Sequence, residues 1–397
     1  MRTRNLLGAA IAAALLAGCG GAGTGVAGPG GTPAGPDQPR LTGALLQNPP
    51  GRTDVLTAAG LRARMQNGPT RDQTLLKLAG DPICDVEVRY LQYTTTGGAG
   101  EPTSASGALM TPGGSDFRCT GARPVVLYAH ATHPEKNFNL ANLGDNTNAA
   151  YTESLTVAAI FAARGYIVVA PNSAGYDSST LGYHPFLNAK QQSGEMLDAM
   201  AAAKTALTTF TPRVTASTQL FLTGYSQGGY VALATQRALE QAGVTVTASA
   251  PMSGPFTNTF RLAYLQDLLA HPFDPGFGLR IDAKANDLRG FTPQAPVFLC
   301  GGSRDATVSF ETNSLALGRA FAGLGPNRVL LLDIDAVPAN PYDQFFTERL
   351  NFALLVAATR EQARETGGDA ELELARNYHA AVFPFCASAV GKFFGKF

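Results

Sequence analysis

The residues best suited to do chemistry lie around Ser226, in residues 220–232, which read LFLTGYSQGGYVA. A short apolar run, Gly-x-Ser-x-Gly and a helix-favouring segment follow one another. This order is typical of a nucleophile elbow, in which a buried strand turns sharply into a helix and presents a serine. Such a serine is strained, and Gly224 and Gly228 lack the Cβ atoms that would crowd it, while Gly229 lets the helix pack closely on neighbouring strands. An ordinary glycine-rich turn is the alternative.

An activated serine needs a base, which a carboxylate in turn holds in one tautomer. In enzymes built on an elbow, the acid and then the histidine follow the serine along the chain. Asp305 comes shortly after the apolar run at residues 296–300 and fits the place of the acid. Asp333 and Asp335, in the next apolar run, are the alternative acids. Asp305 would otherwise be an ordinary turn or helix-capping aspartate.

The base follows from the chain order. Of the five histidines, only His379 lies C-terminal to Asp305. The other four precede the serine or the acid: His130, His133, His184 and His271. An isolated histidine near apolar residues is usually structural, yet the order leaves no substitute, so we expect His379 to be the base. The His130–His133 pair lacks a nearby acid that would complete a ligand set, and we expect no metal site there.

Acyl transfer also requires two N–H groups that point at the developing oxyanion. The amide of Gln227, directly after the serine, is expected to be one of them. The second should come from the loop after the apolar run at residues 124–129, where hydrolases commonly have His-Gly and this chain has His-Ala. We choose Ala131, with His130 and Thr132 as alternatives.

Apolar runs alternate with amphipathic stretches around these residues, which predicts a mostly parallel, twisted sheet with helices on both faces. The expected buried strands are 124–129, 166–170, 220–225, 244–250, 296–300 and 328–334. Two alternating strands at 86–93 and 105–111 come first without an intervening helix, so the sheet should begin antiparallel. Residues 254–292, rich in large apolar residues, predict a small cap insertion, and residues 336–378 predict one or two extra helices.

The N-terminus has the features of an export signal. A start with two arginines precedes the apolar residues 6–16, which are too few to span a bilayer. Residues 16–19, Leu-Ala-Gly-Cys, are similar to the lipobox of bacterial lipoproteins. The resemblance implies that residues 1–18 are removed and that Cys19 is acylated, and Gly20 then favours the outer membrane, on its periplasmic or cell-surface face. A plain secretory signal is the alternative.

Composition sets the remaining boundaries. Residues 19–51 are rich in glycine and proline and predict a lipidated flexible tether, so the globular domain should span 52–397. Lys+Arg and Asp+Glu balance at 30 each without a basic block, which argues against a nucleic-acid partner.

Export also predicts disulfides among the four remaining cysteines. Three pairings are possible for Cys84, Cys119, Cys300 and Cys386. We favour Cys84–Cys119, which brackets the first two strands, and Cys300–Cys386, which would join the loops that carry the expected acid and base.

Five segments together resemble the secretory lipase family of α/β-hydrolases, which includes fungal lipases of the lipase A type and many bacterial exported esterases. They are YAHAT at 128–132, APNSAGY at 170–176, HPF at 184–186, GYSQGG at 224–229 and SGP at 253–255. The resemblance extends over roughly residues 75–392. It implies the α/β-hydrolase fold and hydrolysis of a small-molecule or lipid ester through an acyl-serine, without a cofactor. Asn172 departs from the family, which usually has an aspartate there, and this puts loop structure rather than chemistry in doubt.

The cap of about forty residues is shorter than the lid of the lipase A type, so we expect short to medium acyl esters to be favoured. Two other kinds of hydrolase use the same serine, histidine and aspartate. A serine peptidase of the prolyl-peptidase kind is disfavoured by the lack of a propeller domain or a paired-glutamate motif. A polyester depolymerase is disfavoured by the cap. An alternative of another class is a non-catalytic surface lipoprotein that only binds. The intact set of Ser226, Asp305 and His379 argues against it.

Overall fold

The computed structural model describes residues 42–397, apart from 211–212, 258–277 and 339. The expected signal peptide, the expected lipidation site Cys19 and most of the expected tether therefore lie outside the described residues. So do His271 and the central part of the expected cap.

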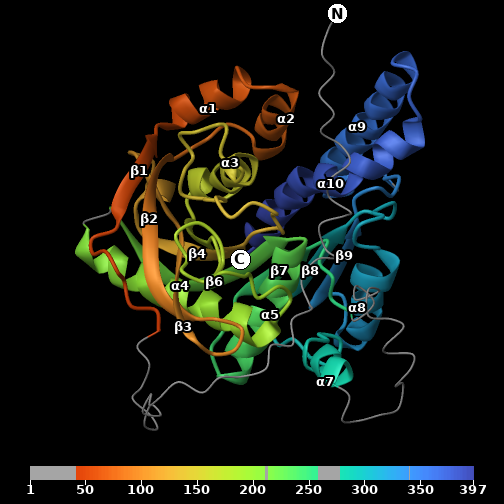
Figure 1. The fold of residues 1–397 in the computed structure, drawn as a ribbon. Coiled ribbons are helices and arrows are strands. Elements are labelled where there is room, and N and C mark those ends of the chain that lie inside the picture. The colour runs from red at the N-terminus through yellow and green to blue at the C-terminus, as the bar shows by residue number, and fades with distance from the viewer. Residues whose placement is uncertain (1–41, 211–212, 258–277, 339) are drawn as a thin grey trace, which may run out of the picture. The chain divides into compact units, whose positions relative to one another are not determined.

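A nine-stranded sheet forms the centre of the described chain, in the order β1-β2-β3-β5-β4-β6-β7-β8-β9 (Figure 1). The strands are β1 (Gly51–Leu56), β2 (Asp85–Thr96), β3 (Pro102–Gly113), β4 (Gly121–Ala129), β5 (Ile167–Pro171), β6 (Val214–Tyr225), β7 (Ala248–Met252), β8 (Val297–Gly301) and β9 (Val329–Asp333). The pairs from β1 through β3 to β5 are antiparallel, and all pairs from β5 through β4 to β9 are parallel. The predicted mostly parallel sheet with an antiparallel beginning is confirmed.

Helices cover both faces of this sheet (Figure 1). They are α1 (Ala58–Gln66), α2 (Thr70–Ala79), α3 (Tyr151–Ile160), α4 (Ala189–Thr209), α5 (Gln227–Gln241), α7 (Gly278–Ala285), α8 (Ala316–Ala320), α9 (Phe346–Glu365) and α10 (Ala370–Phe394). Successive side chains of a strand point to opposite faces. Val126 accordingly packs in one hydrophobic cluster with α1, α2, α3 and α10, and Leu127 packs in a second cluster with α4, α5 and α8. None of the helices within the described residues has the length and apolarity needed to cross a membrane.

The folded chain begins before residue 52, where we expected the tether to end. The backbone N–H of Gly43 donates to Thr94 at 2.7 Å, and Leu45 forms a bridge with Tyr93. These contacts extend the edge pairing that β1 makes with β2. They use backbone groups, which composition does not report, and this explains the wrong boundary.

Both favoured disulfides are present. Cys84 bonds Cys119, and Cys300 bonds Cys386. Our expectation that the second bond joins two loops is wrong, because Cys300 lies in β8 and Cys386 lies in the middle of α10. The described flanks of the expected cap are residues 254–257 and 278–292, where the N–H of Leu288 donates to the carbonyl of Phe256 at 3.3 Å.

Candidate active site

Ser226 lies at the turn between β6 and α5 with φ +56° and ψ −121°, a conformation that non-glycine residues rarely adopt. The glycines around it are needed for steric reasons. A Cβ on Gly228 would lie 2.0 Å from the carbonyl oxygen of Ala129, and one on Gly224 would lie 2.3 Å from that of Gly228. A Cβ on Gly229 would lie 2.5 Å from the carbonyl oxygen of Met252. The residues expected to form an elbow do form one.

The structure brings the three expected catalytic side chains into one hydrogen-bonded chain. Nε2 of His379 lies 2.9 Å from Oγ of Ser226, and Nδ1 of His379 lies 2.6 Å from Oδ2 of Asp305. Because Nδ1 faces a carboxylate, it carries the proton, and Nε2 is left as an acceptor for the serine hydroxyl. This geometry allows His379 to act as a base toward Ser226.

Asp305 is held rigidly in the loop after β8. Its Oδ1 accepts hydrogen bonds from the N–H groups of Thr307 and Val308, both at 2.9 Å. The residue is 5% exposed, so these bonds also satisfy an oxygen that water scarcely reaches. Oδ2 remains directed at His379. Asp305 therefore forms a turn, as in the alternative interpretation of this residue, and it also binds His379.

The alternative acids support the loop that carries Asp305. Asp333 accepts from the N–H of Ser303 at 3.0 Å. Asp335 forms a two-pronged ion pair with Arg304 and accepts from the hydroxyl of Tyr378 at 2.7 Å. Burial favours the neutral acid, but the bonds from Arg304 and Tyr378 prevail and lower the pKa of Asp335.

His379 lies in the interior of α10, whereas we expected a loop to carry it. The hydroxyl of the buried Tyr225, directly before the nucleophile, donates to the backbone carbonyl of His379. The two rings also pack with centroids 5.0 Å apart. The position of α10 is therefore tied to the elbow itself.

The loop after β4 differs from the expected arrangement at Ala131. The N–H of Ala131 donates to Oε1 of Glu153 at 3.0 Å and is therefore already engaged. The hydroxyl of Thr132 donates to Oε1 of Gln227 at 3.0 Å, which puts Thr132 beside the first residue of α5. The N–H of Thr132 has no acceptor among the described residues, so Thr132, one of our alternatives, suits the oxyanion position better than Ala131.

Two histidines support this loop and the elbow. The ring nitrogens of His130 lie 2.5 Å from the carbonyl oxygen of Ala131 and 3.0 Å from that of Asn172. Burial lowers the pKa of His130 to about 3, so it stays neutral, in keeping with the structural role we expected. The sequence indicates no role for His184 beyond its place in the His-Pro-Phe segment. The side-chain amide of Gln227 bonds Nε2 of His184, whose Nδ1–H donates to Ala174 at 2.8 Å.

Asn172 organises the same loops. Its Oδ1 accepts from the N–H of Leu140 at 2.8 Å, and its Nδ2 donates to Ser106 at 2.9 Å. The side chain is fully buried. An amide supplies both the acceptor and the donor that this position requires.

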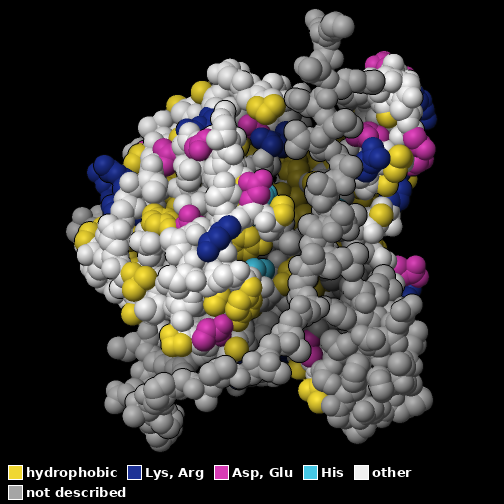
Figure 2. Space-filling view, in the orientation of Figure 1, with side chains coloured by type: hydrophobic (Ala, Val, Ile, Leu, Met, Phe, Trp, Pro, Cys, Tyr) yellow, Lys and Arg dark blue, Asp and Glu magenta, His cyan; other side chains and the backbone are white. Residues whose placement is uncertain are grey.

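Among the described residues, no group of three histidine, cysteine, aspartate or glutamate side chains is arranged to hold a metal ion. His133, the second histidine of the rejected pair, accepts the N–H of Glu135 on its Nδ1 at 3.1 Å. Figure 2 shows Lys and Arg side chains interspersed with Asp and Glu over the described part of one face.

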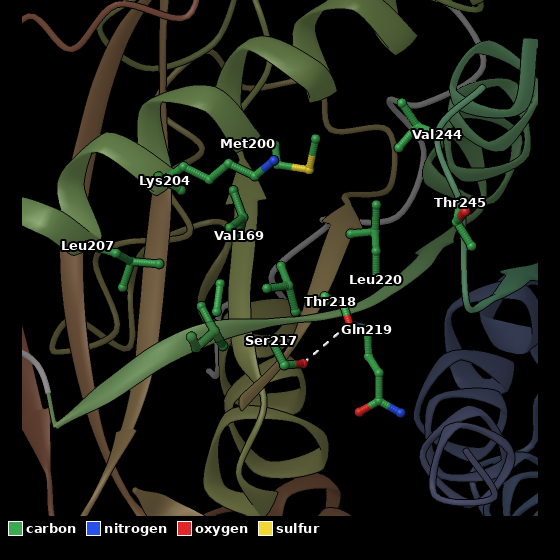
Figure 3. A pocket seen from close by; sticks show the side chains of 14 residues that line it. Val169, Met200, Lys204, Leu207, Ser217, Thr218, Gln219, Leu220, Val244 and Thr245 are labelled. Atoms are coloured by element: carbon green, nitrogen blue, oxygen red, sulfur yellow. Dashed lines mark hydrogen bonds between the residues drawn. The ribbon is translucent and has the colours of Figure 1, made fainter. Parts of the chain in front are cut away.

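The apolar cavity drawn in Figure 3 is separate from this site. It has a volume of about 250 Å³ and is lined by Val169, Met200, Lys204 and Leu220, among others. Leu220 lies six residues before Ser226 on β6, and the strand rises about 3.3 Å per residue. The cavity is therefore near the opposite end of the strand from the nucleophile.

Part of the chain matches a known protein family. Residues 152–332 match the model of the prolyl oligopeptidase family, which is less than half of the chain. The matched region includes Ser226 and Asp305 and ends before His379. No curated protein matches the chain in sequence.

Solved structures provide the broader match. The rice cell wall degrading esterase LipA from Xanthomonas oryzae is 25% identical, with a TM-score of 0.61 over 82% of this chain and 99% of that chain. A ligand-bound form of the same esterase is 24% identical, with a TM-score of 0.65 over 89% and 98%. A putative hydrolase from Legionella pneumophila subsp. pneumophila str. Philadelphia 1 is 18% identical, with a TM-score of 0.62 over 87% and 96%. With the sheet order, these likenesses show that the chain has the α/β-hydrolase fold.

Proposed function

We propose that this protein is a serine hydrolase that cleaves carboxylic esters through an acyl-serine intermediate. The observation that carries the proposal is the continuous chain of hydrogen bonds from Asp305 through His379 to Ser226. Its members are 74 and 153 residues apart along the chain, so no local turn requires them to meet. The strained backbone of Ser226 is a second support, because such strain persists where function requires it.

In the proposed reaction, Oγ of Ser226 attacks the ester carbonyl carbon while Nε2 of His379 takes its proton. The negative charge that forms on the carbonyl oxygen is stabilised by the N–H groups of Gln227 and Thr132. The intermediate collapses, the carbon–oxygen bond to the alcohol breaks, and His379 returns the proton to the leaving alcohol. Water then attacks the acyl-serine with His379 again as base, the bond between the acyl carbon and Oγ of Ser226 breaks, and His379 returns the proton to Oγ as the carboxylic acid leaves. Asp305 stays ionised throughout and holds the imidazole in the required tautomer.

Ester substrates are favoured by the likeness to a solved esterase that covers most of both chains. Within that class, we propose short to medium acyl esters, because an insertion of about forty residues covers less acyl chain than a long lid. Turnover of nitrophenyl butanoate should exceed that of nitrophenyl hexadecanoate. A preference for the long chain would refute this part of the proposal.

A peptidase activity is the second candidate, because residues 152–332 match the prolyl oligopeptidase family model. A panel of nitrophenyl esters and peptide nitroanilides, assayed with wild type and Ser226→Ala, separates the two. Labelling by a fluorophosphonate probe tests the shared chemistry. Modification at Ser226 supports a hydrolase. A folded protein that is neither labelled nor active on the panel would instead indicate a non-catalytic lipoprotein that only binds its ligand.

The N-terminal lipobox supports a further part of the proposal, namely an exported member of the secretory lipase type that is anchored through Cys19 to the bacterial outer membrane. Several acyl chains on one cysteine give lasting attachment, whereas a single chain gives marginal binding. Incorporation of labelled palmitate that is lost in Cys19→Ala, followed by membrane fractionation, would test it. A wild-type protein without label would contradict it.

A further inference from the structure

Glu153 is an acidic residue beside the site that the proposed reaction does not use. It lies in the first turn of α3, on the same face of the sheet as α10 (Figure 1). Its Oε1 accepts two hydrogen bonds, from the hydroxyl of Tyr128 at 2.5 Å and from the N–H of Ala131 at 3.0 Å. Both donors belong to β4 or to the loop that follows it, so one carboxylate oxygen binds the strand end and the loop together.

These contacts are more than the capping of a helix. Ala150 is the N-cap of α3 and makes no side-chain bond there. An acidic residue in the first turn would ordinarily serve its own helix. The oxygen of Glu153 instead bonds residues that lie 25 and 22 positions away in sequence.

The loop held by Glu153 lies directly on the elbow. A Cβ on Gly228 would meet the carbonyl oxygens of Ala129 and His130 at 2.0 and 2.7 Å, so backbone touches backbone there. Two residues after His130, the hydroxyl of Thr132 donates to the side chain of Gln227. A shift of the loop would therefore displace Thr132 from the elbow and from the oxyanion that the two N–H groups are proposed to stabilise.

We infer that Glu153 is the positioning residue of the oxyanion loop: by holding Ala131 and Tyr128, it sets the distance between the N–H groups of Thr132 and Gln227. This inference rests on the proposed function and deepens it. Donors to an oxyanion act mainly in the transition state, so their displacement lowers kcat and leaves KM nearly unchanged.

Glutamine is the conservative replacement at this position. Burial raises the pKa of Glu153 to about 7, so the carboxyl is largely neutral below neutral pH. A neutral carboxyl and a carboxamide each present a carbonyl oxygen that accepts the bonds from Ala131 and Tyr128. Glu153→Gln should therefore retain kcat within about threefold. Glu153→Ala should lower kcat about 10- to 100-fold, which does not exceed the decrease expected when one oxyanion donor is removed.

Glu240 provides a matched control. It is a buried glutamate, and it accepts the N–H groups of Gln294 and Ala295 at 2.8 and 2.9 Å in a loop before β8. Glu240→Ala should lower stability without a change in kcat per active site. Tyr128→Phe removes the second donor while it keeps the carboxylate, and it should lower kcat about threefold to tenfold.

The experiment measures kcat and KM on nitrophenyl butanoate, with active sites counted by fluorophosphonate titration, and also the rate of phosphonylation of Ser226. The inference is supported if Glu153→Ala and Tyr128→Phe slow both rates, Glu153→Gln restores them and KM stays within threefold. It is overturned if both variants keep wild-type rates, or if Glu240→Ala loses as much. If wild type is phosphonylated but does not turn over the ester, the proposed ester hydrolysis is refuted, while the phosphonylation rates still test the role of Glu153. If Ser226 of wild type does not react with the probe, both the proposed function and the inference about Glu153 are refuted.

Discussion

The disulfide between Cys300 and Cys386 links strand β8, which leads to the acid, with helix α10, which carries the base. Cys300 lies five residues before Asp305, and Cys386 lies seven residues after His379 on α10. The bond therefore closes a covalent frame around the hydrogen bond between the carboxylate and the imidazole. The second disulfide, Cys84–Cys119, has no such relation to the site, since it joins the chain before β2 to the segment before β4.

The two disulfides should differ in their effect on activity more than in their effect on stability. The chain-entropy model gives a loss of about 4 to 5 kcal/mol for Cys300→Ala/Cys386→Ala and about 4 kcal/mol for Cys84→Ala/Cys119→Ala. The first pair should also lower kcat about tenfold in the folded fraction, because small displacements of catalytic groups are costly. Urea unfolding and active-site-normalised kinetics check this. Equal kcat in the two double variants would show that the bond does not position the triad.

Loss of a triad member should nearly abolish turnover while the fold remains. Ser226→Ala and His379→Ala should each lower kcat about 10⁴-fold or more, and Asp305→Asn about 10⁴-fold because the imidazole then adopts the wrong tautomer. The losses should not add in the double variants, because the three side chains act as a unit. Circular dichroism confirms folding, and a variant that keeps more than a few per cent of turnover would remove that residue from the proposed mechanism.

The elbow predicts a sharp contrast between two glycines. Gly228→Ala would put a Cβ 2.0 Å from the backbone oxygen of Ala129, which no side-chain rotation relieves, whereas a Cβ on Gly194 in α4 meets nothing within 4 Å. We expect Gly228→Ala to lose more than about 4 kcal/mol or to fail to fold. Gly194→Ala should be neutral or stabilise by up to about 1 kcal/mol, since alanine favours a helix. Thermal unfolding distinguishes them, and a Gly228→Ala protein of wild-type stability would contradict the packing at the elbow.

Features with a local signal could be predicted from the sequence. The elbow, the alternation of strands and helices and the order of Ser226, Asp305 and His379 all follow from short patterns. The position of His379 on a helix could not be predicted in this way. Pro384 lies inside α10, and because an internal proline usually ends or kinks a helix, the local pattern around His379 does not indicate a continuous helix.

Our expectation for the oxyanion loop differs from the structure for a different reason. The bond that engages Ala131 comes from Glu153, 22 residues away and on another element. No spacing or composition near residue 131 reports this contact, because it arises only when α3 packs beside the end of β4. The edge pairing of Gly43 and Leu45 with β2 was missed on the same grounds.

Glu195 should make stability depend on pH. Burial raises its pKa from 4.5 to about 7, aided by the charge of Asp198 and opposed by bonds from Ala174, Gln191 and Tyr93. Between pH 4.5 and 7 the folded state therefore keeps a proton on Glu195 that the unfolded state has lost. The contribution of Glu195 to stability is thus greatest below about pH 4.5 and falls as the pH rises toward 7. The loss approaches about 3 kcal/mol above pH 7, at about 1.4 kcal/mol per pKa unit.

The variant Glu195→Gln removes this titration and tests its sign. Glutamine cannot ionise, but it gives up one acceptor, which costs about 1 kcal/mol at any pH. Relative to the variant, wild type should therefore be about equally stable at pH 5 and about 2 kcal/mol less stable at pH 8. Urea unfolding at the two pH values measures the difference. A gap between the two proteins that does not change with pH would mean that Glu195 ionises in the folded protein as it does in the unfolded chain.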